Sequence, residues 1–96
     1  MAEMSQRLKN QIRTSCTNMN PATIAALGQA VSSGTLGWFV DEFSWAMENK
    51  AITVAGWNDL TGRAFHDSDR PLVEKDAQDI WNAVAPNEPF PGIRWS

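Results

Sequence analysis

The sequence predicts a single small domain over residues 1–96, mainly α-helical and folded as a compact bundle of about four helices. Its 96 residues are 43% hydrophobic, which suits one modest core of ordinary domain size. Apolar residues recur three and four positions apart along most of the chain, as they do on one face of a helix. Two proline-containing segments, Asn20-Pro21 and residues 67–71, have the composition of helix starts.

The first two helices are predicted over about residues 3–16 and 21–31. The first has a narrow apolar stripe with a spacing of four: Met4, Leu8, Ile12 and Cys16. Asn20 is a favoured N-cap for the second, and Pro21 fits the first helical position because its missing N–H would be unpaired there anyway. Gly28 lies in the apolar stripe of this helix, at a cost of about 1 kcal/mol relative to Ala. We therefore expect another helix to approach closely over Gly28.

A third helix is predicted over about residues 35–49, with apolar residues on two opposite faces. One face carries a core stripe: Leu36, Phe39, Val40, Phe43, Ala46 and Met47. Trp38 and Trp45 lie on the other face, seven residues apart and among acidic residues. One apolar face is enough to anchor a helix in a small domain. The tryptophan face therefore needs a second cover, either from residues 51–66, from the C-terminal tail or from a partner.

Residues 51–66 allow two interpretations. The β-branched residues at 52–54 slightly favour a short β-hairpin with strands near 51–56 and 62–66. A loop with one extra helical turn is the alternative, because a lone two-stranded ribbon is only marginally stable.

A fourth helix is predicted over about residues 70–85, with Pro71 in its first turn and Pro86 ending it. The tail over residues 86–96 contains three prolines and favours an extended form. Its large apolar residues alternate with polar or small ones: Phe90, Ile93 and Trp95. We expect this tail to pack back onto its own domain, and a recognition tail is the alternative.

Charge and cysteine content restrict the partners and the compartment. The net charge is −3, and residues 35–96 hold ten of the eleven acidic residues. An acidic body disfavours nonspecific nucleic-acid binding, which depends on Lys and Arg neutralising phosphates. Cys16 is the only cysteine, so no internal disulfide forms. The chain shows no signal peptide and no apolar stretch long enough to span a bilayer, which predicts a cytoplasmic protein without a membrane partner.

No motif for catalysis, metal binding or cofactor binding stands out. His66 is the only histidine, and it is followed by Asp67 and Asp69. A histidine beside carboxylates could serve as a general base, but a zinc site would need further His or Cys ligands. A calcium loop would need another Asp or Asn where Pro71 stands. We therefore expect no catalytic residues, no metal and no cofactor, and interpret residues 66–69 as a polar loop that caps a helix.

A helix-turn-helix is the main alternative from another functional class. The second and third predicted helices are joined by a short glycine-containing turn, as that motif requires. In such a regulator Lys9 and Arg13 would contact phosphates. The outer face of the third helix is acidic and aromatic, however, whereas base readout calls for Arg, Lys, Asn or Gln.

The predicted function is that of a non-enzymatic, small acidic protein that binds another protein with a basic surface and blocks or bridges it. The predicted binding residues are Trp38, Asp41, Glu42, Trp45 and Glu48. Tryptophan is enriched among binding hot spots, and acidic neighbours steer a basic partner. Small anti-defence and immunity proteins of phages and bacteria offer an analogy of class only. The alternatives are a helix-turn-helix regulator, a small enzyme using His66, and a symmetric homodimer that buries the tryptophan faces.

Overall fold

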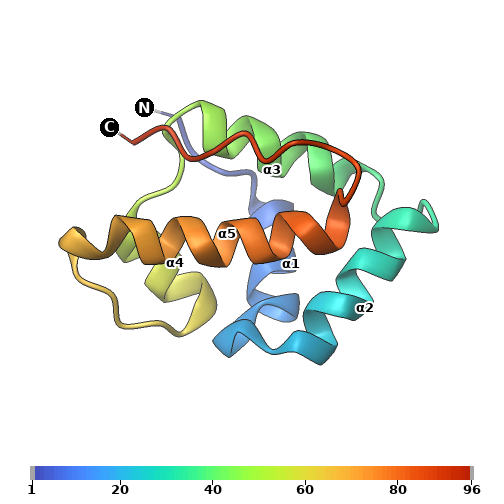
Figure 1. Cartoon of the computed structure of the whole chain (residues 1–96), viewed down its shortest axis with the longest axis horizontal. Helices are drawn as coiled ribbons and strands as arrows, with labels where there is room; N and C mark the ends of the chain where they lie inside the picture. Colours follow the sequence, from blue (N-terminus) through green and yellow to red (C-terminus); the bar gives the residue numbers. More distant parts are fainter. Residues whose placement is uncertain (1, 96) are drawn as a thin grey trace.

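Five α-helices surround one hydrophobic core in the computed structural model, which describes residues 2–95 (Figure 1). Two 3-10 helices also occur. In chain order the elements are α1 Gln6–Ser15, η1 Thr17–Met19, α2 Pro21–Ser32, α3 Trp38–Glu48, α4 Val54–Thr61, η2 Asp67–Asp69 and α5 Arg70–Val84. The prediction of a compact, mainly helical fold is confirmed, but the helix count is five instead of about four. In the part of the chain described, no helix has the length and apolar character needed to cross a membrane.

The predicted β-hairpin over residues 51–66 is wrong, because α4 occupies its centre and residues 2–95 contain no strand. Thr53 caps α4: its backbone is extended, and its side-chain oxygen accepts the Gly56 N–H at 3.0 Å. Gly62 ends the helix in the left-handed region, with φ +76, a conformation that glycine adopts without strain. The buried side chains of α4 recur at helical spacing: Val54, Trp57, Leu60 and Thr61. Burial of this face outweighs the β-branched character of residues 52–54.

The close approach predicted over Gly28 is confirmed. The α2 helix begins as expected, since the Asn20 side chain accepts the Ala22 N–H at 2.9 Å and Pro21 is the first helical residue. The α5 backbone crosses at Gly28, where a Cβ atom would lie 2.4 Å from the carbonyl oxygen of Ala83. Glycine therefore lets these two helices pack with their backbones nearly in contact.

Aromatic rings from three helices form the centre of the core. Phe43 of α3 stacks on Trp57 of α4, with ring centroids 6.4 Å apart and an interplanar angle of 14°. The same ring packs against Trp81 of α5, also at 6.4 Å, and against Phe39 at 5.5 Å. The predicted core face of α3 is thus buried, although Leu36 and Val40 at its edge are only partly covered.

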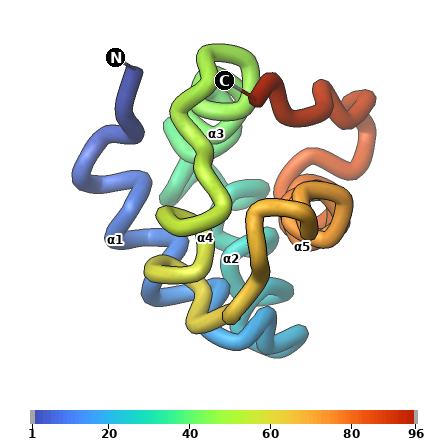
Figure 2. The backbone as a smooth tube through the Cα atoms, turned by 90° about the vertical axis from the view of Figure 1, so that its left-hand side faces the viewer, coloured from blue at the N-terminus to red at the C-terminus, as the bar shows by residue number. Residues whose placement is uncertain are grey.

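The C-terminal tail runs back over the domain between α3 and α5 (Figures 1 and 2). Its backbone is fixed at two points: the Arg94 N–H donates to the Met47 carbonyl at 2.7 Å, and Trp81 Nε1 donates to the Glu88 carbonyl at 3.0 Å. Ile93 is buried in the core. The expectation that the tail packs onto its own domain is therefore confirmed for residues 86–95.

Candidate functional site

The predicted binding residues of α3 divide into two groups, and the first is engaged inside the molecule. The guanidinium of Arg7 in α1 lies 4.4 Å from the centroid of the Trp38 ring and forms an ion pair with Glu42. The Ser5 hydroxyl donates to the same carboxylate. Hydrogen bonds from Arg7 and Ser5 hold the pKa of Glu42 below its ordinary value. The start of α1 thus contributes to the cover over Trp38, which sequence reasoning did not consider.

The second group, which we call the α3 outer face, comprises Asp41, Trp45 and Glu48, all exposed to solvent. Their spacing of four and three residues places them on one side of the helix, opposite the buried core face. Trp45 is 46% exposed, and Leu72 of α5, at 48%, is the other large hydrophobic residue exposed among those described. Ser44 donates to the Glu48 carboxylate at 3.3 Å. The α3 outer face therefore presents an aromatic ring flanked by two carboxylates.

A groove of about 440 Å³ lies beside this face, between α3 and the tail. Asp41 and Glu48 line it from α3, and the tail contributes Glu88 and Phe90. The described residues that line this groove include no Lys or Arg. Three carboxylates beside apolar surface create a negative potential that is complementary to a cationic side chain. Glu88 and Phe90 are site residues that sequence reasoning missed, because spacing alone gives no register between the tail and α3.

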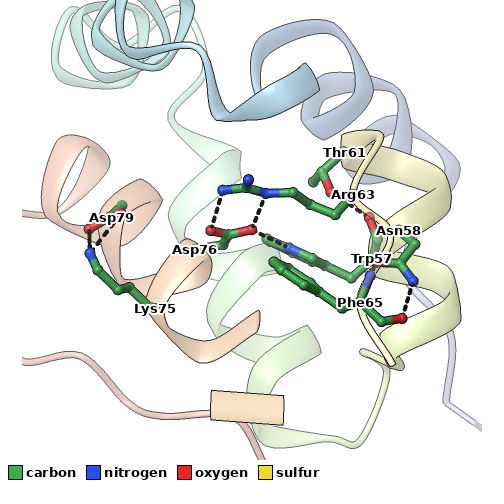
Figure 3. Close-up of polar contacts among 8 residues, drawn as sticks. All are labelled: Trp57, Asn58, Thr61, Arg63, Phe65, Lys75, Asp76 and Asp79. Carbon is green, nitrogen blue, oxygen red and sulfur yellow. Dashed lines mark hydrogen bonds and ion pairs between the residues drawn. The ribbon is translucent and has the colours of Figure 1, made fainter. Parts of the chain in front are cut away.

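A second polar cluster lies inside the domain, around Asp76 of α5 (Figure 3). Arg63 makes a bidentate ion pair with this carboxylate: Nη2 donates to Oδ1 at 2.9 Å, and Nε donates to Oδ2 at 3.0 Å. Trp57 Nε1 also donates to Oδ2, at 3.3 Å. Asp76 is only 5% exposed, yet both of its oxygens have partners. These bonds hold the segment after α4 against α5. Both carboxylate oxygens of Asp76 are engaged in them, so this carboxylate has a structural role.

The same segment is closed by reciprocal bonds between Asn58 and Phe65, also visible in Figure 3. The Asn58 amide donates to the Phe65 carbonyl at 2.8 Å, and its oxygen accepts the Phe65 N–H at 3.0 Å.

Sequence reasoning missed the Asp76 cluster. The signal was the position of Asp76 beside the apolar stripe of α5, three residues after Val73 and four before Ile80, where a carboxylate needs a buried partner.

The segment around His66 forms a helix cap, as interpreted from the sequence. The Asp69 N–H donates to the backbone carbonyl of His66 at 2.8 Å, and the Asp69 carboxylate accepts the His66 N–H at 2.9 Å. His66 and Asp67 are exposed. Among residues 2–95 no group of three His, Cys, Asp or Glu side chains is arranged to hold a metal ion.

Cys16 is fully buried in the core, remote from solvent. Burial, together with the charge of Asp76, raises the pKa of its thiol to about 12. The nucleophilic form of cysteine is the thiolate, so this side chain packs as a small apolar group at neutral pH.

The residues of the helix-turn-helix alternative lie on α1 and α3. Asp41, Trp45 and Glu48 form the outer face of α3, whereas Lys9 and Arg13 line a cavity between α1 and α4. Arg13 pairs there with Asp59 at 3.1 Å. The cations that would contact phosphates thus lie on different elements from the helix that would read the bases.

Comparisons with known proteins give no match: none of the protein-family models fits the chain, and neither curated proteins nor solved structures show similarity to it.

Proposed function

We propose that this protein is a non-enzymatic protein-binding module, an inhibitor or adaptor that docks the α3 outer face on a basic surface of a partner protein. One observation carries the proposal: Trp45 is 46% exposed on the α3 helix. Exposing an indole ring to water is unfavourable relative to burying it, by roughly 25 cal/mol for each Å² of apolar surface. An interface regains that free energy when the ring is covered.

The flanking charges support a basic partner. Asp41 and Glu48 flank Trp45 on the helix, and Glu88 joins them across the groove. Acidic groups around an aromatic anchor accelerate association with a cationic surface and disfavour acidic competitors. A Lys or Arg side chain entering the groove would meet three carboxylates and the ring of Phe90, which suits both its charge and its apolar stem.

Trp38 and Glu42 have a supporting role in this proposal. Their contacts with Arg7 hold the first turns of α3 against α1, and so fix the orientation of the outer face. Two further parts of the proposal rest on the sequence alone. They are a cytoplasmic location and a mode of action like that of small inhibitory proteins of phages or bacteria.

The test is quantitative capture of partners by the immobilised protein, compared between Trp45→Ala and Leu72→Ala. The two side chains are almost equally exposed on different helices, so Leu72→Ala controls for the general loss of surface hydrophobicity. We expect Trp45→Ala to weaken capture about 30-fold or more, as loss of a hot spot of roughly 2 kcal/mol implies, and Leu72→Ala to leave it unchanged. Equal effects of both substitutions, or no effect of Trp45→Ala, would contradict the proposal.

The charge component is tested separately with Asp41→Asn/Glu48→Gln. A matched control, Asp67→Asn/Asp79→Asn, removes the same charge from exposed positions elsewhere. The first variant should slow association and flatten its dependence on salt, because steering by the α3 outer face is lost. Light scattering on the purified wild type measures its oligomeric state and so tests the homodimer alternative. If the wild type is a dimer through this face, Trp45→Ala should be a monomer.

A further inference from the structure

A second, larger cavity lies on another side of the molecule, between the N-terminal segment, α1, the α3–α4 connection and α4. Its volume is about 640 Å³, within the range typical of small-molecule sites. In Figure 2, α1 lies beside α4 and the segment of residues 49–53 that leads into it. Its apolar lining comes from short side chains and from Met4 and Leu60. The proposed protein-binding surface does not use this cavity.

The charges around this cavity are unlike those of the rest of the acidic body. Lys9, Arg13 and Lys50 line it together with Glu3 and Asp59. The Arg13–Asp59 ion pair at 3.1 Å offsets two of these charges, which leaves two ammonium groups against the Glu3 carboxylate. The N-cap Thr53 and Gly56 of the first turn of α4 also line the cavity, and the positive end of a helix dipole favours an anion. The residues that line the cavity therefore carry one more positive than negative charge, in a protein whose net charge is −3.

The backbone of Lys50 provides an independent observation. Lys50 has φ +58, and the Ala51 N–H donates to the Ala46 carbonyl at 3.1 Å, the bond that characterises a Schellman end of a helix. Glycine is the usual residue at this left-handed position, because a Cβ atom is strained there. Here the position carries a lysine, and this exposed residue is one of those that line the cavity. Strain of this kind persists only where the surrounding structure holds it in place, and it is enriched at ligand-binding sites.

We propose that this cavity binds a small amphipathic anion, a carboxylate or phosphate joined to an apolar body. Lys50 and Lys9 hold the anionic head, and Met4 and Leu60 contact the apolar part. The half-buried position of Lys9 strengthens its interaction with a charged head, because the effective dielectric is lower than in bulk water. The lysine at the glycine-like position supplies the charge on which anion recognition depends.

The test uses the whole protein and three probes with the same eight-carbon chain: octanoate, octyl phosphate and octanol. Binding is followed by two-dimensional ¹H–¹⁵N NMR. We expect one or both anions to shift the amide signals of Lys50, Ala51 and Gly56 in a saturable manner, and octanol to bind about tenfold more weakly, as loss of a charged hydrogen bond implies. The tighter of the two anions identifies the head group. Octanol binding as tightly as the anions, or shifts that are absent or spread evenly over the surface, would overturn the proposal.

Two substitutions of Lys50 separate binding from stability. Lys50→Met keeps the strained backbone and an apolar stem but removes the charge, whereas Lys50→Gly also relieves the strain. Both should weaken binding of the anion about tenfold, and only Lys50→Gly should raise the melting temperature. Lys75→Met, at an exposed lysine of α5, is the matched control and should bind like the wild type. Retention of full affinity by both Lys50 variants would refute the role of this side chain.

Discussion

The guanidinium of Arg7 lies 4.4 Å from the centre of the Trp38 ring, so a cation from the first helix covers one of the two tryptophans on the far face of α3. The same Arg7 side chain pairs with Glu42, one turn further along α3. This three-residue contact distinguishes the two tryptophans by role. Trp38 belongs to the junction of α1 and α3, and Trp45 belongs to the surface.

The two tryptophans should therefore differ in their effect on stability. Trp38→Ala removes a partly buried ring that packs on Phe39 and Arg7, and we expect a loss of about 2 kcal/mol in the free energy of unfolding, below the value for a fully buried ring. Trp45→Ala alters an exposed position and should change it by less than about 0.5 kcal/mol. Urea unfolding followed by circular dichroism measures both. Similar losses for the two variants would show that Trp45 is part of the core.

The ion pair at Glu42 predicts a dependence of stability on pH. The pKa of Glu42 is lowered in the folded state, so folding favours the ionised form. Its contribution is fully present above the ordinary glutamate pKa of 4.5 and is lost as the pH falls through the lower folded-state value. Glu42→Gln should therefore unfold more easily than the wild type at neutral pH, and the difference should shrink below 4.5. Urea unfolding across this range tests the prediction, and a constant difference would contradict it.

The contact between α2 and α5 predicts that Gly28→Ala is destabilising despite the higher helix propensity of alanine. The new Cβ would lie 2.4 Å from the Ala83 carbonyl oxygen, and this backbone atom cannot move without shifting α5. We expect a loss of about 1–3 kcal/mol in unfolding free energy, the usual cost of overpacking. Gln29→Ala, at the neighbouring exposed position of the same helix, is the control and should be neutral. Stabilisation by Gly28→Ala would show that the two helices are further apart.

The buried pair of Arg63 and Asp76 predicts a strong asymmetry between single and double substitutions. Arg63→Met leaves a carboxylate that is 5% exposed with only the Trp57 indole as donor, and we expect a loss of about 3–5 kcal/mol. Arg63→Met/Asp76→Leu removes both charges and should recover much of that loss. Thermal unfolding of both variants measures the difference. A double variant less stable than Arg63→Met would show that the ion pair itself stabilises the fold.

Helix boundaries were predictable where local signals mark them. Asn20-Pro21 and Pro71 fix the starts of α2 and α5 through capping and the geometry of proline, which act within one turn. The α4 helix was predicted only as the less favoured alternative, a loop with one extra helical turn, because its signals conflict. Thr53 and Gly62 are a good N-cap and a good helix end, yet the β-branched residues just before Val54 favour a strand, and only burial of Trp57 decides between them.

The site was predictable in its periodicity but not in its contacts. The spacing of Asp41, Trp45 and Glu48 defines one face of a helix without any tertiary information. The contact of Arg7 with Trp38, and that of Glu88 with the groove, join segments far apart in the chain. Their register depends on how the helices pack, which spacing within a single helix does not encode.

The crossing at Gly28 and Ala83 also has a consequence for synthesis of the protein on the ribosome. The α2 helix emerges before α5, which contributes the backbone that it packs against. Until α5 has left the exit tunnel, the apolar stripe of α2 lacks this partner, and the long-range contact cannot form. Nascent chains stalled before α5 should therefore expose Ile24 and Leu27 to chaperones, and emergence of α5 from the tunnel should bury them.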